Sequence, residues 1–332
     1  MSYKTELKSK YYPQEYSLTP DFAGVTLKLE LTNICNHRCI TCPHSKQMRT
    51  QGFMDPALAK RLIREAAELH VDKIALFLNG ESFLVPNIAE YVRYCKECGI
   101  KYVFLTTNGS RASHQQLAEV MEAGLDSLKF SLNASDPETY RLVHGSDDFG
   151  CALDNLRFAR DYRDKQNLKC RLLAGCVLTD YTKHQLDQYC QRIGPLVDDL
   201  LFLKPDNFAG YMVRELEQVF HDDSFEDPRV YSFGDKRLPC PLLFNSANVT
   251  YEGYLTLCCS EALNYMVTED LNQMSLLEAW NSSRMQDIRA RHLRQEIAGT
   301  QCYNCMFNAV APVIPANQEL FEISSLSSKG DG

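Results

Sequence analysis

Three cysteines near the N-terminus have the spacing of a metal-binding loop. In the segment LELTNICNHRCITCPHS (residues 29–45), Cys35, Cys39 and Cys42 are separated by three and two residues and follow directly on an apolar run. Structural zinc sites normally have four ligands in two close pairs, but this loop offers three. Three thiolates suit three irons of a [4Fe–4S] cluster and leave the fourth iron open. We therefore expect a cluster with one exchangeable position; a chance triplet is the alternative.

Four further cysteines are spaced so that they could form a second site. Gly253 in a predicted hairpin turn would let the chain double back and bring Cys240 close to Cys258. The later CYNC sequence adds Cys302 and Cys305. Four thiols in this arrangement could bind an iron–sulfur cluster or zinc. Because no cysteine follows Cys305, the sequence supports one additional cluster.

Other cysteines have less defined roles. Cys259 could replace its neighbour Cys258 as a ligand, fill a small apolar space, or face a substrate as a hydrogen-atom donor. Cys95 and Cys98 form another CxxC pair in YVRYCKECGI, at the end of a predicted helix. Since this pair has no partner pair, we interpret its members as ordinary helix cysteines.

The elements that would position these motifs alternate between strand and helix patterns. Apolar runs predict six strands, at residues 25–32, 73–78, 101–106, 127–132, 170–178 and 199–204. Amphipathic segments predict the helices between them, at residues 55–69, 86–98, 113–123, 136–165 and 183–193. This alternation is typical of an α/β fold with a parallel sheet covered by helices. Functional residues should then follow the C-terminal ends of the strands.

The change of pattern along the chain suggests five regions. We expect an N-terminal extension (1–24), a core (25–211), a polar and irregular linker or bridging region (212–238), a C-terminal domain (239–322) and a disordered tail (323–332). The C-terminal domain should contain a hairpin that turns at Glu252 and Gly253. A single helix is predicted within residues 275–293.

The CNHRCITC sequence after the first strand resembles the cluster motif of the radical S-adenosylmethionine (SAM) superfamily. The resemblance implies a partial (β/α)6 TIM-like barrel with Cys35, Cys39 and Cys42 as cluster ligands. It also implies that the open iron binds SAM, and that SAM cleavage yields a 5′-deoxyadenosyl radical, which abstracts a substrate hydrogen. Further implied SAM contacts lie at strand ends and beside the third cysteine: Gly80 and Glu81 of NGES, Asn108 of TTNG, Ser131 and Asn133 of SLNAS, and Thr41. Where the family often has arginine this chain has His144, which we expect to be a solvated residue at a helix end.

The C-terminal cysteines resemble the SPASM/twitch extension of radical SAM enzymes, in the twitch form with one auxiliary [4Fe–4S] cluster. The chain is most similar to twitch-type dehydrogenases such as 2-deoxy-scyllo-inosamine dehydrogenase. This implies oxidation of an alcohol of a sugar, cyclitol or similar small metabolite, with the auxiliary cluster as electron acceptor and a flavodoxin or ferredoxin as electron donor. Lys204, Asp206 and Asn207, after the sixth strand, are candidate substrate contacts, and an ordinary surface loop is the alternative.

Three other functions stay open: an epimerase with Cys259 as hydrogen donor, a peptide-modifying enzyme, and a zinc-binding protein that is not an enzyme. The net charge of −8 argues against nucleic-acid binding, which needs a basic surface. The N-terminus has no apolar signal segment, and no run approaches the roughly 20 apolar residues that span a bilayer. We therefore expect a cytoplasmic protein with a small-molecule substrate and no membrane partner.

Overall fold

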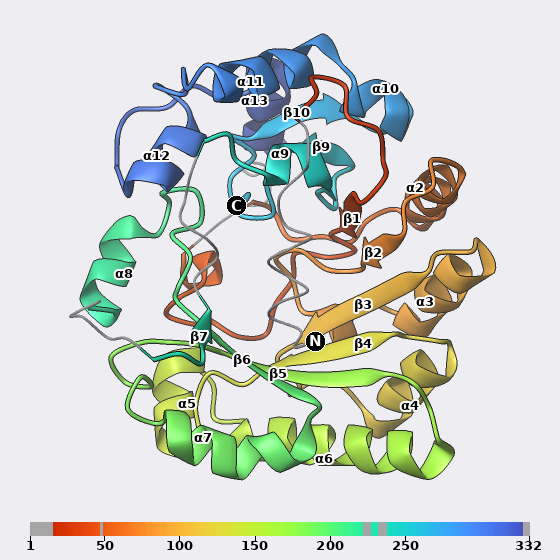
Figure 1. Ribbon diagram of the computed structural model, residues 1–332, viewed down its shortest axis with the longest axis vertical. Coiled ribbons are helices and arrows are strands. Elements are labelled where there is room, and N and C mark those ends of the chain that lie inside the picture. Colours follow the sequence, from red (N-terminus) through yellow and green to blue (C-terminus); the bar gives the residue numbers. More distant parts are fainter. Residues whose placement is uncertain (1–15, 47–48, 222–226, 232–237, 328–332) are drawn as a thin grey trace.

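The computed structural model describes residues 16–46, 49–221, 227–231 and 238–327. These residues form a curved sheet with helices along its outer side (Figure 1). Strands β1 to β7 are parallel and lie in the sheet in chain order. Their bounds are β1 Thr26–Leu29, β2 Lys73–Ala75, β3 Tyr102–Thr107, β4 Ser127–Ser131, β5 Arg171–Val177, β6 Asp199–Leu203 and β7 Val230–Tyr231. The predicted α/β class and the six predicted strands are confirmed.

Alternation along the strands gives the sheet two different faces. In β1, Leu27 and Leu29 are fully buried in the core shared with the helices, whereas Lys28 between them is partly exposed. In β4, Phe130 is fully buried and Lys129 before it is partly exposed. Because successive side chains of a strand point to opposite faces, both lysines lie on the inner face of the sheet.

The outer layer is built from the helices that connect the strands. Asp55 caps the first of them, since its carboxylate accepts a hydrogen bond from the Leu58 backbone N–H at 2.9 Å and Pro56 follows at the first helical position. The helices are α2 Pro56–Glu68, α3 Ile88–Glu97, α4 His114–Glu122, α5 Pro137–His144, α6 Phe149–Gln166, α7 Leu186–Ile193 and α8 Val213–Val219, with short 3₁₀ turns η1 Pro43–Ser45, η2 Ser82–Leu84 and η3 Gly194–Leu196.

The C-terminal part extends the same sheet beyond β1. Strand β8 (Ser246–Val249) pairs in parallel with β1, and the antiparallel strands β9 (Tyr254–Thr256) and β10 (Val267–Asp270) follow it. Gly253, with φ of +92°, forms the predicted hairpin turn between β8 and β9. The remaining helices are α9 Leu242–Asn245, α10 Leu276–Trp280, α11 Ser283–Leu293, α12 Gln301–Phe307 and α13 Gln318–Ser327.

Three predicted segments need correction. The region 212–238 is not irregular throughout, because it contains helix α8 and strand β7. Strand β7 pairs with β6. Residues 222–226 and 232–237 of this region lie outside the described part. The single helix within 275–293 is two helices, since the Ser282 side chain caps a new one. The tail predicted as disordered is helical to Ser327, and residues 328–332 are outside the described part.

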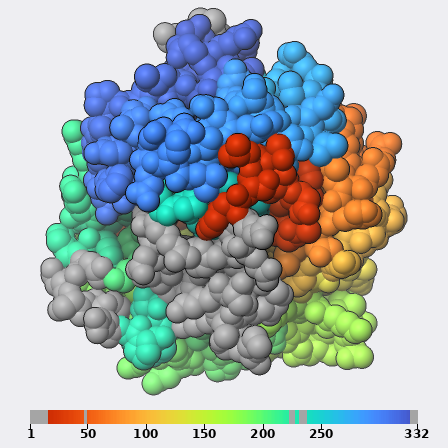
Figure 2. Space-filling view, turned by 45° about the horizontal axis from the view of Figure 1, so that its top comes forward, coloured from red at the N-terminus to blue at the C-terminus, as the bar shows by residue number. Residues whose placement is uncertain are grey.

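The N-terminal segment that is described packs on the C-terminal helices. The Trp280 indole N–H donates to the Pro20 carbonyl at 2.9 Å, and the Arg289 guanidinium donates to the Leu18 carbonyl at 2.8 Å. Figure 2 shows this segment, in red, lying against the blue surface of the C-terminal part. Among the described residues, every helix is too short or too polar to span a lipid bilayer.

Candidate functional site

The cysteine loop (residues 35–42) leaves β1 and docks on the end of helix α5. The backbone N–H groups of Arg38 and Ile40 donate to the His144 and Val143 carbonyls at 3.2 and 3.0 Å. Gly145, with φ of +64°, ends the helix, and a Cβ there would lie 3.0 Å from the Arg38 carbonyl oxygen. The loop therefore uses the carbonyl groups that a helix end leaves without intrahelical partners.

The three thiols of the loop are half-buried and act on one another electrostatically. Burial raises the pKa of Cys35 to about 11 and that of Cys42 to about 12. Burial also raises the pKa of Cys39, and the charges of Cys42 and Cys35 raise it further. Thiolates that repel each other in a partly apolar site need a cation to stabilise them. All three cysteines are free of disulfides, so this donor set fits an iron–sulfur cluster.

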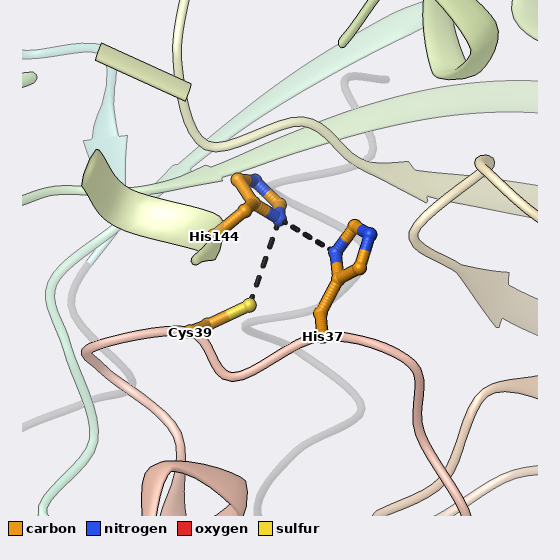
Figure 3. A group of neighbouring side chains, drawn as sticks. All are labelled: His37, Cys39 and His144. Carbon is orange, nitrogen blue, oxygen red and sulfur yellow. Dashed lines mark hydrogen bonds between the residues drawn. The ribbon is translucent and has the colours of Figure 1, made fainter. Parts of the chain in front are cut away.

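Two histidines lie in and beside this loop: His37 belongs to it and was not singled out from the sequence, and His144 was expected to be solvated. His37 and His144 are each 1% exposed, so the expectation that His144 is solvated is wrong. The Nδ1 atom of His144 lies 3.2 Å from His37 Nδ1 and 3.5 Å from Cys39 Sγ (Figure 3). The Asn133 backbone N–H donates to His144 Nε2 at 3.0 Å. Burial and the neighbouring His37 lower the pKa of His144 to about 3, so its ring is neutral.

His37, Cys39 and His144 place one ligand atom each within 4.8 Å of one another, which is close enough to share a metal ion. Cys39, however, also belongs to the three-thiol loop, and His37 Nε2 is bonded to Asp148 Oδ2 at 3.1 Å. We therefore treat the histidines as neighbours of the cluster. The only feature of the sequence that drew attention to either histidine is that His144 stands where the family often has arginine.

The NGES turn after β2 holds the start of the cysteine loop. The Glu81 backbone N–H donates to the Ile34 carbonyl at 2.8 Å, and a Cβ on Gly80 would lie 2.2 Å from the Thr32 carbonyl oxygen. Only glycine allows this approach. The Glu81 carboxylate accepts from the Thr107 hydroxyl at 2.6 Å and from the Asn108 backbone at 2.7 Å. Its oxygens thus join the ends of β2 and β3.

Asn79, the first residue of the NGES turn, connects the turn to three other regions. Its side-chain amide donates to Glu30 Oε1 at 3.1 Å and to the Glu261 carbonyl at 2.6 Å. Its carbonyl oxygen lies 2.8 Å from His44 Nε2. Asn79 therefore links the turn to the residue after β1, to η1 after the cysteine loop and to the C-terminal part.

The other predicted SAM contacts lie at neighbouring strand ends. The Asn108 amide donates to Asn36 Oδ1 at 3.0 Å, and Asn133 Oδ1 accepts from the Val177 backbone at 2.9 Å. Ser131 is the last residue of β4 and is partly exposed, and Thr41 is buried next to Cys42. The structure thus gathers these residues around the cysteine loop, while their contacts with SAM stay predictions.

The C-terminal cysteines Cys240, Cys258, Cys302 and Cys305, called the auxiliary set below, also act on one another electrostatically. Burial raises the pKa of Cys302, and the charges of Cys240 and Cys305 add to this effect. A hydrogen bond with Cys259 and burial raise the pKa of Cys258, which Cys240 and Cys305 raise further. The donor set is again made of thiols, the usual ligands of a [4Fe–4S] cluster.

Cys259 faces a different environment from Cys258. The charges of Lys28 on the inner face of β1 and of Asp206 after β6 both act on the pKa of the Cys259 thiol. The thiol of Cys259 shares a hydrogen bond with Cys258, which lowers the Cys259 pKa, and Lys28 lowers it as well. Cys240 and Cys305 therefore act on the Cys258 thiol, whereas Lys28 and Asp206 act on the Cys259 thiol.

The predicted substrate contacts after β6 lie beside the auxiliary set. Asn207 is buried, and its amide donates to the Cys305 carbonyl at 2.9 Å and to Asn308 Oδ1 at 2.6 Å. Asp206 Oδ2 accepts from the Ser260 hydroxyl at 2.7 Å. Lys204 is partly exposed in the same loop. Asn207 thus binds helix α12 and the residue after it. The sequence did not indicate this contact.

Family models match two parts of the chain. The Radical SAM superfamily model matches residues 29–186, and the SPASM model, described as an iron–sulfur cluster-binding domain, matches residues 240–306. Together they span well over half of the sequence, including both cysteine sets. The chain belongs to the radical SAM superfamily. Its cofactors are SAM and [4Fe–4S] clusters, and the SPASM match, which includes the auxiliary set, favours an iron–sulfur cluster over zinc there.

The curated relatives of this radical SAM enzyme match about half of its length. A protein named "Probable GTP 3',8-cyclase" of Methanothermobacter thermautotrophicus is 27% identical over 184 residues, which is 55% of this chain and 59% of that protein. One with the same name from Thermococcus kodakarensis is 32% identical over 185 residues, which is 55% of this chain and 58% of that protein. This chain therefore spans less than three fifths of the length of these relatives.

Solved structures share the fold of this radical SAM enzyme across both parts. BtrN in complex with AdoMet and 2-DOIA has a TM-score of 0.56 at 17% identity, covering 89% of this chain and 95% of that chain. SuiB of Streptococcus suis, bound to the precursor peptide SuiA, has a TM-score of 0.62 at 14% identity, covering 86% of this chain and 69% of that chain. At these identities the likeness concerns the fold alone.

Proposed function

We propose that the enzyme oxidises an alcohol group of a sugar, cyclitol or similar small metabolite to a carbonyl. When bound, SAM and its cluster supply a 5′-deoxyadenosyl radical that removes the C–H hydrogen, and the auxiliary cluster takes up the remaining electron. We further propose that Cys35, Cys39 and Cys42 hold the first cluster and that the auxiliary set holds the second. A flavodoxin or ferredoxin is the proposed source of the initiating electron.

The observation that carries this proposal is the complete auxiliary set. Four cysteines supply a ligand for each iron of a [4Fe–4S] cluster, in contrast to the three cysteines of the first loop. Such a cluster has no open iron for a substrate, which favours a role in electron transfer. The likeness to BtrN, whose structure contains AdoMet and 2-DOIA, is consistent with this role.

The hydroxyl proton also needs an acceptor, and we propose Lys129. Its side chain lies on the inner face of the sheet, and no ion pair of Lys129 occurs among the described residues. Burial and the positive charge of Lys28 lower its pKa to about 8. A lysine tuned to this range by burial is suited to act as a general base. Cys259 influences the same ammonium group, so Lys129 adjoins the loop that carries Cys258.

The balance of the reaction follows from these assignments. The alcohol loses its carbon-bound hydrogen atom to SAM chemistry, its hydroxyl proton to Lys129 and one electron to the auxiliary cluster. The carbon–oxygen single bond becomes a double bond. Two electrons leave the substrate in all, as the formation of a carbonyl requires.

The test compares the enzyme with a variant that lacks auxiliary ligands, Cys302→Ala together with Cys305→Ala. With 2-deoxy-scyllo-inosamine and a panel of simple sugars and cyclitols as probes, the enzyme should form a carbonyl product together with 5′-deoxyadenosine. The variant should still release 5′-deoxyadenosine but form no carbonyl. Cys98→Ala, which changes a half-buried cysteine of another CxxC pair, is the matched control. Carbonyl formation by the variant, or its absence with every alcohol in the active enzyme, contradicts the proposal.

A redox-neutral epimerase is the second candidate, and the position of Cys259 favours it specifically. Lys28 on the inner face of β1 and Asp206 after β6 act on this thiol, which could there return a hydrogen atom to a substrate radical. In that case the product would keep the oxidation state of the substrate and gain solvent deuterium. Cys259→Ala would then stop product formation while 5′-deoxyadenosine release continued.

A further inference from the structure

The hydrogen bonds of His144 fix the position of its ring proton. The Asn133 backbone N–H donates to Nε2 at 3.0 Å, so this nitrogen acts as the acceptor. A neutral imidazole carries one proton, on the other nitrogen. The proton of His144 is therefore on Nδ1, the atom that faces His37 and Cys39 (Figure 3).

Two acceptors share this proton. His37 Nδ1 lies 3.2 Å from His144 Nδ1, and Cys39 Sγ lies 3.5 Å from it. The other nitrogen of His37, Nε2, is 3.1 Å from the Asp148 carboxylate, which places the proton of His37 on Nε2 and leaves its Nδ1 free to accept. When Cys39 becomes a thiolate ligand, its sulfur gains negative charge and becomes the stronger acceptor.

The surroundings hold the His144 ring in this orientation. The ring stacks on Tyr140 with centroids 3.9 Å apart and planes 14° apart. Its own backbone carbonyl binds the Arg38 N–H of the cysteine loop. Because helix α5 and the loop are joined on both sides of Cys39, the distance between the ring and the sulfur cannot change without separating the two elements.

We propose that His144 is a positioning residue that donates a hydrogen bond from Nδ1 to the Cys39 sulfur and makes the SAM-binding cluster easier to reduce. Reduction adds negative charge to a cluster, and hydrogen bonds to its sulfurs stabilise that charge and raise the reduction potential. This proposal depends on Cys39 being a cluster ligand and is independent of the substrate and the net reaction.

The test is a redox titration of the SAM-binding cluster in the full chain, followed by electron paramagnetic resonance. The signal that changes on addition of SAM identifies this cluster. His144→Phe keeps an aromatic ring for the stack on Tyr140 but lacks the donor, and it should shift the midpoint potential to a more negative value at unchanged iron content. An unchanged potential in a fully loaded variant overturns the proposal.

Two comparison variants separate this role from general damage to the network. His37→Leu removes the competing acceptor and keeps the donor, so the potential should not become more negative. An equal negative shift in His37→Leu and His144→Phe would mean that the network acts only structurally, and it would overturn the proposal. His114→Phe is the control, since His114 stacks on Phe158 at 4.0 Å and has a half-exposed side chain.

A measurement on the unaltered protein covers the case in which His144→Phe takes up no cluster. With 15N-labelled histidine, pulsed paramagnetic resonance of the reduced SAM-binding cluster should detect coupling to a histidine nitrogen. The same coupling should persist in His37→Leu. Its absence from the unaltered protein, or its loss in His37→Leu, contradicts a hydrogen bond from His144 to Cys39.

Discussion

Burial and the positive charge of Lys28 set the environment of Lys129, which forms no ion pair with the residues that the structure describes. Two acids that follow strands of the same sheet have other partners: Glu30 is bonded to Arg49 at 2.7 and 2.8 Å, and Asp206 accepts from Ser260. An ammonium group in such surroundings loses its proton more readily than one in water. This makes proton transfer from a substrate hydroxyl chemically accessible near neutral pH.

The rate of carbonyl formation should rise with pH through about 8 and then level off. The sign follows from the charge: the protonated form predominates below the lowered pKa, and only the neutral amine above it can accept a proton. Lys129→Met should remove this rise and lower the rate by roughly 10² to 10⁴-fold, while 5′-deoxyadenosine release continues. Lys101→Met is the control, because this side chain is 76% exposed and pairs with Asp72. A pH profile that is the same in enzyme and Lys129→Met excludes this role.

At the scale of residues, the sequence predicted which cysteines belong to the sites better than it predicted the burial and contacts of the residues around them. The cysteines are identified by spacing alone, because a metal cluster needs a fixed set of donors. The position of His144 was mistaken because a residue at a helix end is usually solvated, and nothing local indicates that the cysteine loop covers this helix end. The contact of Asn207 with the Cys305 carbonyl depends on residues about a hundred positions apart, and spacing does not reveal it.

At the scale of elements, three short connections hold the cysteine loop. The NGES turn supports its start, the end of α5 supports its middle, and Asn108 after β3 bonds to Asn36 within it. Each connection follows the C-terminal end of a parallel strand or the helix behind it. The loop therefore depends on backbone packing that tolerates little change in volume.

Replacement of Gly80 should prevent binding of the first cluster and leave binding of the second cluster unchanged. A Cβ at this position would lie 2.2 Å from the Thr32 carbonyl oxygen and 3.0 Å from that of Ile34, and both are backbone atoms. Gly80→Ala should therefore displace the start of the cysteine loop and reduce the iron content from about eight per chain toward about four. Iron analysis of the reconstituted protein measures this directly.

Gly150→Ala is the matched control for that experiment, because a Cβ there meets no atom within 4 Å and the residue lies in helix α6. It should keep the full iron content. If Gly80→Ala also binds about eight irons, the turn does not support the cluster as described.

Elements with strong local signals were predicted well. Asp55 and Pro56 start α2 as expected, and Gly253 forms the hairpin turn. The break between α10 and α11 was missed, because the apolar pattern continues across it while the Ser282 side chain starts a new helix. Strand β7 was missed because two residues are too few for a periodic pattern.

At the scale of the whole molecule, the C-terminal part is joined to the core on both sides of the parallel sheet. Strand β8 pairs with β1, and the loop after β6 contacts α12 through Asn207. Arg49 binds Glu30 at the end of β1 and Glu252 in the hairpin turn, at 2.7 and 2.6 Å. The two cysteine sets therefore belong to one continuous framework, and both adjoin the inner face that carries Lys28 and Lys129.

This arrangement could not be read from the sequence. The alternation of strands and helices predicts the parallel order of β1 to β6, since each connection is local. The pairing of β8 with β1 joins residues about 220 positions apart. From the sequence, β8 could equally have paired with the strand at the other edge of the sheet. The site residues could thus be named from motifs, but the space between the two cysteine sets required the structure.

The central claim is that the three thiols of the cysteine loop support the cleavage of SAM. Its most direct test incubates the anaerobically reconstituted protein with SAM and a strong reductant and measures 5′-deoxyadenosine. The account predicts release of 5′-deoxyadenosine by the unaltered chain and none by Cys39→Ala, while Cys98→Ala behaves like the unaltered chain. No release from a chain loaded with both clusters, or equal release from Cys39→Ala, would contradict it.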